Sequence, residues 1–74
     1  MTEKAFLKKI GPRIKQIRLE KGISQQELAA KLDYEKSNMS RLESGVLNPT
    51  IATLYRVAKA LGIPLIELLD LEDK

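Results

Sequence analysis

The stretch KSNMSRLESG, Lys36 to Gly45, gathers side chains that donate and accept hydrogen bonds. In a helix, its polar members would fall within an arc of roughly 140°, with the apolar Met39 and Leu42 pointing away. The members of that arc are Lys36, Ser37, Ser40, Arg41 and Ser44. Such a face can recognise anions or hydrogen-bonding edges, and the alternative is an ordinary solvated surface.

Composition argues against catalysis. The 74 residues include no cysteine and no histidine, so the chain has no thiolate nucleophile, no imidazole base, no Cys/His metal site and no disulfide. A catalytic pair of carboxylates remains chemically possible. We therefore expect that the protein is not an enzyme and that it binds no metal ion and no cofactor.

Length and hydropathy predict one small domain over 1–74, with 43% hydrophobic residues for its core. The apolar runs are only a few residues long, and the N-terminal MTEKAFLKKI lacks the features of a signal peptide. We therefore expect a soluble cytoplasmic protein.

Charge is distributed unevenly along the chain. Residues 1–62 carry a net charge of +6 and residues 63–74 a net charge of −3. The basic part suits a polyanion, and the acidic tail is expected to face away from it. From charge alone, a solvated charged surface fits equally well.

Local signals predict where helices begin and end. Gly22, Gly45 and Gly62 each precede an aliphatic residue, which is typical of a helix ending at a left-handed glycine. Ser24-Gln25-Gln26-Glu27 has the form of a capping box, and Thr50 is a candidate cap for a later helix. These signals indicate an all-α chain without strands.

Apolar spacing predicts five helices and their buried faces. The expected inward residues are Ile14, Ile17 and Leu19 in the first helix, Leu28, Ala29 and Leu32 in the second, and Ile51, Leu54, Val57, Ala58 and Leu61 in the fourth. The third is expected to begin near Glu35 or Lys36, and Pro64 is expected to begin the fifth. The start of the first helix stays open, because Phe6 and Ile10 continue its stripe whereas Gly11-Pro12 favours a start or a kink. Residues 1–9 are therefore treated as an N-terminal extension.

The segment from ISQQELAAKLDYEKSNMSRLESGVLNPT to ALGIPLIELL, preceded by IKQIRLEKG, resembles the phage-repressor (Xre-like) helix-turn-helix family. The residues that carry the resemblance are Gln25, Ala29, Ser40, Glu43, Gly45, Asn48-Pro49 and Ala60-Leu61-Gly62. It implies a compact, lambda-repressor-like fold of five helices, with the helix-turn-helix in the second and third.

Four positions are expected to be structural. Ala29 lies where the second helix would cross the third, and a larger side chain would separate them. The resemblance implies that Arg18 and Glu43 bridge the first and third helices, a pair that matters mainly if it is shielded from solvent. Gly45 is expected to end the third helix.

The resemblance also places the third helix in the major groove of double-stranded DNA. Arg41 and Ser37 are the leading base-reading candidates, because Arg binds guanine O6 and N7 and Ser permits close approach. Lys36 could equally reach a phosphate, and Asn38 could bond adenine or the backbone. For Ser40 and Ser44, contact with the DNA backbone or no contact is at least as well supported as base reading.

Phosphates are expected at helix N-termini, where free N–H groups and the helix dipole attract anions. Gln25 matches the phosphate-contacting position of the resembling family, and Asn48 with Thr50 forms a second such place. Simple capping is the better interpretation of the Ser24 and Thr50 side chains.

Four positions depart from the family pattern. Asp33 replaces the usual turn glycine, at a cost of about 1 kcal/mol if its backbone is left-handed. Glu35 replaces the common Ser or Thr cap and brings a negative charge toward the expected phosphates. Val46 and Leu47 replace residues that are often basic.

The last segment, PLIELLDLEDK (64–74), has more leucines than one short helix can bury. Leu65, Leu68, Leu69 and Leu71 are candidate contacts of a homodimer that would place two recognition helices about one DNA turn apart. Closure of the chain's own core is the alternative.

Two functions remain. The first is a sequence-specific transcriptional regulator, dimeric on a palindromic operator. The second is a protein-interaction module of the same fold, such as an antitoxin that holds a partner protein. Polar Lys36, Ser37 and Arg41 favour the first, because partner-binding faces usually present aromatic or aliphatic anchors.

Overall fold

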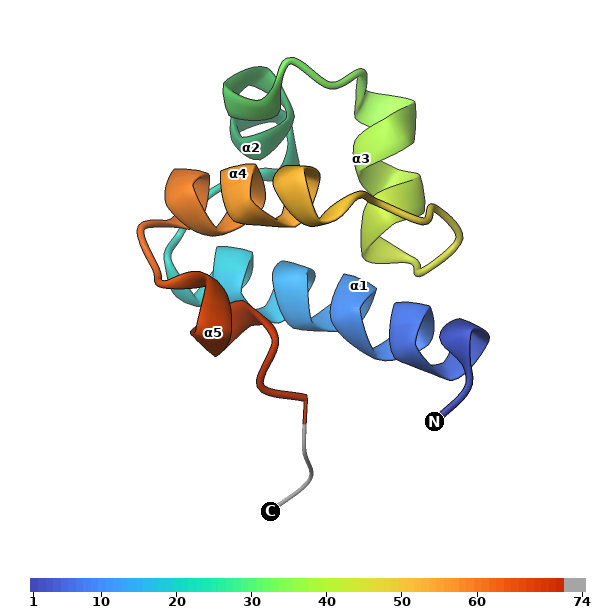
Figure 1. The fold of residues 1–74 in the computed structure, drawn as a ribbon. Helices are drawn as coiled ribbons and strands as arrows, with labels where there is room; N and C mark the ends of the chain where they lie inside the picture. The colour runs from blue at the N-terminus through green and yellow to red at the C-terminus, as the bar shows by residue number, and fades with distance from the viewer. Residues whose placement is uncertain (72–74) are drawn as a thin grey trace.

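The computed structural model describes residues 1–71, in which the chain forms five helices and no strand (Figure 1). The helices are α1 (Glu3–Glu20), α2 (Gln25–Leu32), α3 (Lys36–Glu43), α4 (Ile51–Leu61) and α5 (Leu65–Leu68). α1 and α4 run roughly alongside each other, and α3 stands across α1 with its C-terminal end nearest to it (Figure 1). The predicted all-α fold is thus confirmed, while residues 72–74 of the acidic tail lie outside the described residues.

α1 begins much earlier than Gly11. The Thr2 side chain caps it by accepting a hydrogen bond from the Ala5 backbone N–H at 3.1 Å, and the helix continues through Pro12. Most of the expected extension, residues 1–9, is therefore the first two turns of α1. The stripe formed by Phe6 and Ile10 indicated this alternative correctly, because Ile10 is buried and Phe6 packs against the core.

Two residues expected in the core are exposed. Leu19 is 59% exposed, because two residues after Ile17 a helix has turned by about 200°. Ile51 is 64% exposed, since it is the first residue of α4 and lies beyond the edge of the core. The expectation was wrong for both, whereas the other predicted members of the two stripes are buried.

The structure of α5 differs from what was predicted for the C-terminal leucines. Pro64 is its N-cap and not its first residue, and the helix has only four residues. Leu68 is fully buried in the core, so it has no surface for a second copy. Leu65, Leu69 and Leu71 are half-buried against the same core, while Ile66 is 74% exposed.

Local capping fixes the relation between helices. The Ser24 capping box, the Thr50 cap and the positive φ of the three predicted glycines are all present. Between α2 and α3, Asp33 adopts the left-handed conformation at φ 56°, and the next residue, Tyr34, donates from its backbone N–H to the Ala29 carbonyl at 2.8 Å. This hydrogen bond closes the end of α2 in the Schellman manner and sets the direction in which α3 begins.

Two features bear on wider function classes. Within residues 1–71, no helix is both long enough and apolar enough to cross a membrane. The same part of the chain contains no group of three His, Cys, Asp or Glu residues placed to hold a metal ion.

Candidate nucleic-acid interface

α3 has one fully buried side and one exposed side. Met39 is 0% and Leu42 is 1% exposed, so these two side chains anchor the helix in the core. The exposed residues on the other side are Lys36, Ser37, Ser40, Arg41 and Ser44, and Asn38 is half-buried at the edge. The structure therefore brings the predicted polar residues onto one accessible face.

The start of α3 lacks a side-chain cap. Glu35 has the extended backbone of an N-cap, but its carboxylate makes no capping hydrogen bond. The N–H groups of the first turn consequently have no side-chain partner from this position, and Glu35 itself is exposed beside them. The departure noted in the sequence thus leaves a weakly terminated first turn next to Lys36 and Ser37.

The C-terminal end of α3 touches α1 directly through its backbone. A Cβ on Gly11 would lie 2.6 Å from the Leu42 carbonyl oxygen and 2.8 Å from the Glu43 carbonyl oxygen. A Cβ on Gly45 would lie 2.7 Å from the Leu7 carbonyl oxygen. The two glycines therefore permit a close approach of the two backbones that any side chain would block. They set the distance between α1 and the C-terminal end of α3.

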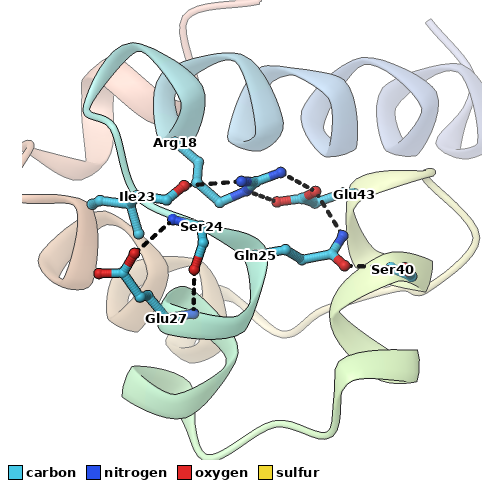
Figure 2. A network of polar contacts seen from close by, with 7 residues as sticks. All are labelled: Arg18, Ile23, Ser24, Gln25, Glu27, Ser40 and Glu43. Atoms are coloured by element: carbon cyan, nitrogen blue, oxygen red, sulfur yellow. Dashed lines mark hydrogen bonds and ion pairs between the residues drawn. The ribbon is translucent and has the colours of Figure 1, made fainter.

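A buried ion pair reinforces this contact (Figure 2). Arg18 Nε donates to Glu43 Oε2 at 2.6 Å and Arg18 Nη2 donates to Glu43 Oε1 at 3.1 Å, with both residues only 5% exposed. Arg18 Nη1 also donates to the Ile23 carbonyl at 2.9 Å, which ties the pair to the loop before α2. The predicted bridge between the first and third helices is present, and it is the shielded, bidentate form.

The same carboxylate orients the first residue of α2. Gln25 Nε2 donates to Glu43 Oε1 at 3.1 Å, and Gln25 Oε1 accepts from Ser40 Oγ at 3.4 Å (Figure 2). From the sequence, Gln25 and Ser40 were expected as separate positions. No local signal could connect them, because the contact exists only once α2 and α3 are packed.

Ala29 is 4% exposed, in the packed region between α2 and its neighbours. A methyl group fits there, as expected of a position where helices cross closely. Its burial is what the predicted structural role requires, while the crossing of α2 and α3 at Ala29 stays a prediction.

The remaining candidate residues lie around the end of α3. Ser44 Oγ donates to the Arg41 carbonyl at 3.1 Å, so its proton is used within its own helix. Thr50 Oγ1 accepts from the Thr53 backbone N–H at 3.1 Å, which is the capping role preferred from the sequence. Asn48 is exposed in the loop between α3 and α4.

The capping box of α2 lowers the pKa of Glu27. The Ser24 backbone N–H donates to Glu27 Oε1 at 3.0 Å, and the Glu27 backbone N–H donates to Ser24 Oγ at 3.0 Å (Figure 2). The bond from the Ser24 backbone lowers the pKa of Glu27 most, followed by the Ser24 side chain and the nearby Lys31. The negative charge of Glu27 is thereby favoured at the N-terminus of α2.

Comparison with known proteins agrees with this geometry. A Helix-turn-helix family model matches residues 14–68. The uncharacterized transcriptional regulator y4dJ of Sinorhizobium fredii is 39% identical over 67 residues, which are 90% of this chain and 87% of that protein. The transcriptional regulator SinR of Bacillus subtilis is 45% identical over 62 residues, which are 82% of this chain and 56% of SinR.

Solved structures give the same result. The restriction-modification controller protein C.AhdI of Aeromonas hydrophila superposes with a TM-score of 0.81 at 34% identity, covering 86% of this chain and 97% of that one. SinR, crystallised in complex with DNA, superposes with a TM-score of 0.74 at 45% identity, covering 82% of this chain and 98% of the crystallised one. The arrangement of α2 and α3, their buried anchors and these matches together show that the chain belongs to the phage-repressor (Xre-like) helix-turn-helix family.

Proposed function

We propose that this chain is a sequence-specific, DNA-binding transcriptional regulator that inserts α3 into the major groove. The observation that carries the proposal is the two-sided character of α3. Its exposed face holds Lys36, Ser37 and Arg41. On its opposite face, the side chains of Met39 and Leu42 are at most 1% exposed. A rigid helix with such a face can present hydrogen-bonding groups to base edges without reorganising. The proposed activity is binding in the cytoplasm, with no catalytic step.

Base reading is assigned first to Arg41 and Ser37. Arg41 is exposed, and its guanidinium makes no hydrogen bond or ion pair within residues 1–71, so it is available for the O6 and N7 acceptors of guanine. Ser37 is short enough to let the helix approach. Lys36 and the half-buried Asn38 complete the candidate reading edge, with a phosphate contact as the alternative role of Lys36.

Backbone contacts are assigned to residues around α3. Gln25 has a second Nε2–H besides the one given to Glu43, and it stands in the first turn of α2, where an anion is favoured. Asn48 and the N-terminal turn of α4 at Thr50 form the second place, whereas the Ser44 hydroxyl proton is used by the Arg41 carbonyl. Such contacts set affinity and register, and they carry no sequence information.

The relatives support the proposal. SinR was crystallised with DNA, and C.AhdI is a restriction-modification controller protein. We extend DNA recognition from these proteins to this chain on the strength of the shared fold and the exposed face of α3.

We further propose that the chain binds as a homodimer on a palindromic site. Leu65, Leu69 and Leu71 keep partly accessible apolar surface, and the exposed Ile66 adds to it. A two-fold contact at this end would place two copies of α3 on successive half-sites. Sedimentation that finds only monomer at tens of micromolar, with and without bound DNA, would contradict the dimer.

Selection of bound sequences from a random DNA duplex pool tests the function. The wild-type chain should enrich one palindromic motif. Arg41→Ala should relax the preference at one position of each half-site, with a loss of roughly 1–3 kcal/mol of discrimination there. Asn48→Ala should weaken binding to all sequences by similar factors, because it removes a phosphate contact. Sequence-independent losses from both variants would contradict the role of Arg41.

A protein-interaction module is the second candidate. It is favoured by two exposed apolar residues one turn apart on α4, Ile51 and Tyr55, at 64% and 54% exposure. SinR has also been crystallised with the protein SinI. Recovery of one stoichiometric protein partner, together with no enriched DNA motif, would place this function first.

A further inference from the structure

The hydrogen bonds that link α1, α2 and α3 run in one direction. Arg18 can only donate, because a guanidinium has no acceptor, and it gives two hydrogen bonds to Glu43. The Glu43 carboxylate accepts these bonds and a third from Gln25 Nε2. Gln25 then turns its Oε1 toward Ser40, whose Oγ donates to it (Figure 2).

The buried pair decides which way the Gln25 amide faces. A reversed amide would place its oxygen against the Glu43 carboxylate, where two acceptors would repel each other. Glu43 cannot turn away from this contact, since it is 5% exposed and held bidentately by Arg18. The donor end of Gln25 therefore faces Glu43, and its acceptor end faces Ser40.

This order leaves Ser40 with one kind of hydrogen bond to offer. A serine hydroxyl has a single proton and two acceptor lone pairs. In this structure the proton points toward Gln25 Oε1, at an oxygen–oxygen distance of 3.4 Å, which leaves the two lone pairs for a ligand. Ser40 is exposed on the same face of α3 as Ser37 and Arg41.

We propose that Ser40 reads DNA as a hydrogen-bond acceptor and selects a base with an exocyclic amino group, adenine N6 or cytosine N4, in the major groove. Arg18, Glu43 and Gln25 are positioning residues for this contact. The inference rests on the proposed function. It also changes the role expected from the sequence, because an unprotonated phosphate has no hydrogen to give to Ser40.

The first test uses the free protein and needs no DNA. Solvent exchange of the side-chain NH2 groups is measured by NMR for Gln25 and for its exposed neighbour Gln26. The Gln25 NH2 should exchange more slowly, because one of its hydrogens is bound to Glu43. In Glu43→Gln, if it folds, the difference should shrink. Equal exchange rates for Gln25 and Gln26 in the wild-type chain would overturn the proposed order of hydrogen bonds.

The second test is sequence selection with matched variants. Ser40→Ala identifies the base pair that Ser40 contacts. At that pair, the wild-type chain should prefer the natural duplex by roughly 2- to 10-fold over one that lacks the exocyclic amino group, with purine in place of adenine or 2-pyrimidinone in place of cytosine, as one neutral hydrogen bond provides. Gln25→Ala should reduce that preference at the same position, because the freed hydroxyl can then donate as well as accept. Gln26→Ala is the control and should leave it unchanged.

The outcomes separate the two proposals. Equal binding to duplexes with and without the exocyclic amino group at the Ser40 position, or no position affected by Ser40→Ala, overturns this inference and leaves the proposed function intact. A preference that survives Gln25→Ala overturns the positioning role. Absence of any motif for the wild-type chain overturns the proposed function and base reading by Ser40 with it, even where NMR finds the predicted exchange at Gln25.

Discussion

Gly11 in α1 and Gly45 after α3 lie so close that a Cβ on Gly11 would be 2.8 Å from the Gly45 backbone nitrogen. The contact joins the N-terminal half of α1 to the end of the proposed recognition helix. Because neither backbone can move without displacing its helix, the contact sets the position of the DNA-facing residues relative to the core.

Gly11→Ala is expected to lower the free energy of unfolding by about 1–3 kcal/mol, the usual cost of forcing a methyl group into a packed site. In an unobstructed helix the same change would stabilise by up to about 1 kcal/mol, so the sign of the effect is diagnostic. Urea unfolding followed by circular dichroism measures it. Gln16→Ala, at an exposed position of α1, is the control and should change stability by no more than about 0.5 kcal/mol. A stabilising Gly11→Ala would contradict the close contact.

Gly11 also illustrates what the sequence could and could not predict. Caps and terminal glycines depend on neighbours within a few residues, so the Ser24 box, the Thr50 cap and the helix after Gly22 could be predicted from local pattern. Gly11-Pro12 was interpreted locally as a helix start or kink. Its real role depends on the backbone at Leu42 and Glu43, more than 30 positions away, and no local pattern contains that information.

The candidate site likewise has some features that a local sequence pattern predicts and others that it does not. The exposed face of α3 follows from helical periodicity alone, since Met39 and Leu42 must be buried. The Arg18–Glu43 pair was expected only through the family resemblance, because two charges 25 residues apart have no spacing that predicts contact. The bonds from Gln25 to Glu43 and Ser40 were not expected at all, since they require the packed geometry of two helices.

The buried ion pair should respond unequally to single and double substitution. Glu43→Leu leaves the Arg18 guanidinium buried without a counter-charge and should destabilise the fold by about 3–5 kcal/mol. The double variant Arg18→Met/Glu43→Leu removes both charges and should recover much of that loss. The measurement is a double-mutant cycle from urea unfolding. Additive losses, with the double variant less stable than either single one, would indicate that the two residues contribute independently.

The capping box should make stability depend on pH at the acidic end. The pKa of Glu27 is lowered in the folded chain, chiefly by the Ser24 backbone N–H, so the folded state favours the ionised carboxylate more than the unfolded state does. The resulting stabilisation is present above the pKa of the unfolded chain and is lost as the pH falls through the lower, folded value.

The carboxyl carbon of Glu27, followed by NMR from neutral to acidic pH, measures this pKa directly. In Ser24→Ala the pKa should move back toward its ordinary value, because the side-chain part of the box is removed while the backbone bond loses its support. Glu27→Gln should flatten the acidic part of the stability curve. An unchanged pKa in Ser24→Ala would show that the hydroxyl has no part in lowering it.

Glu35 is expected to limit both stability and DNA affinity. It occupies the N-cap of α3 without forming a capping hydrogen bond, and its negative charge stands at the first turn of the proposed recognition helix. Glu35→Ser should add a cap that stabilises the fold by about 1 kcal/mol. It should also strengthen binding to all DNA sequences, because a charge that repels phosphates is removed.

Glu35→Gln separates these two effects, because it removes the charge without supplying a good cap. It should raise affinity for DNA nearly as much as Glu35→Ser does, with little gain in the free energy of unfolding. Fluorescence anisotropy at two salt concentrations gives the affinities, and the gain over wild type should shrink at the higher one, since screening weakens the repulsion that the wild-type carboxylate exerts. If Glu35→Gln leaves affinity unchanged at low salt, Glu35 points away from the DNA, and the first turn of α3 lies farther from the phosphates than the proposed docking requires.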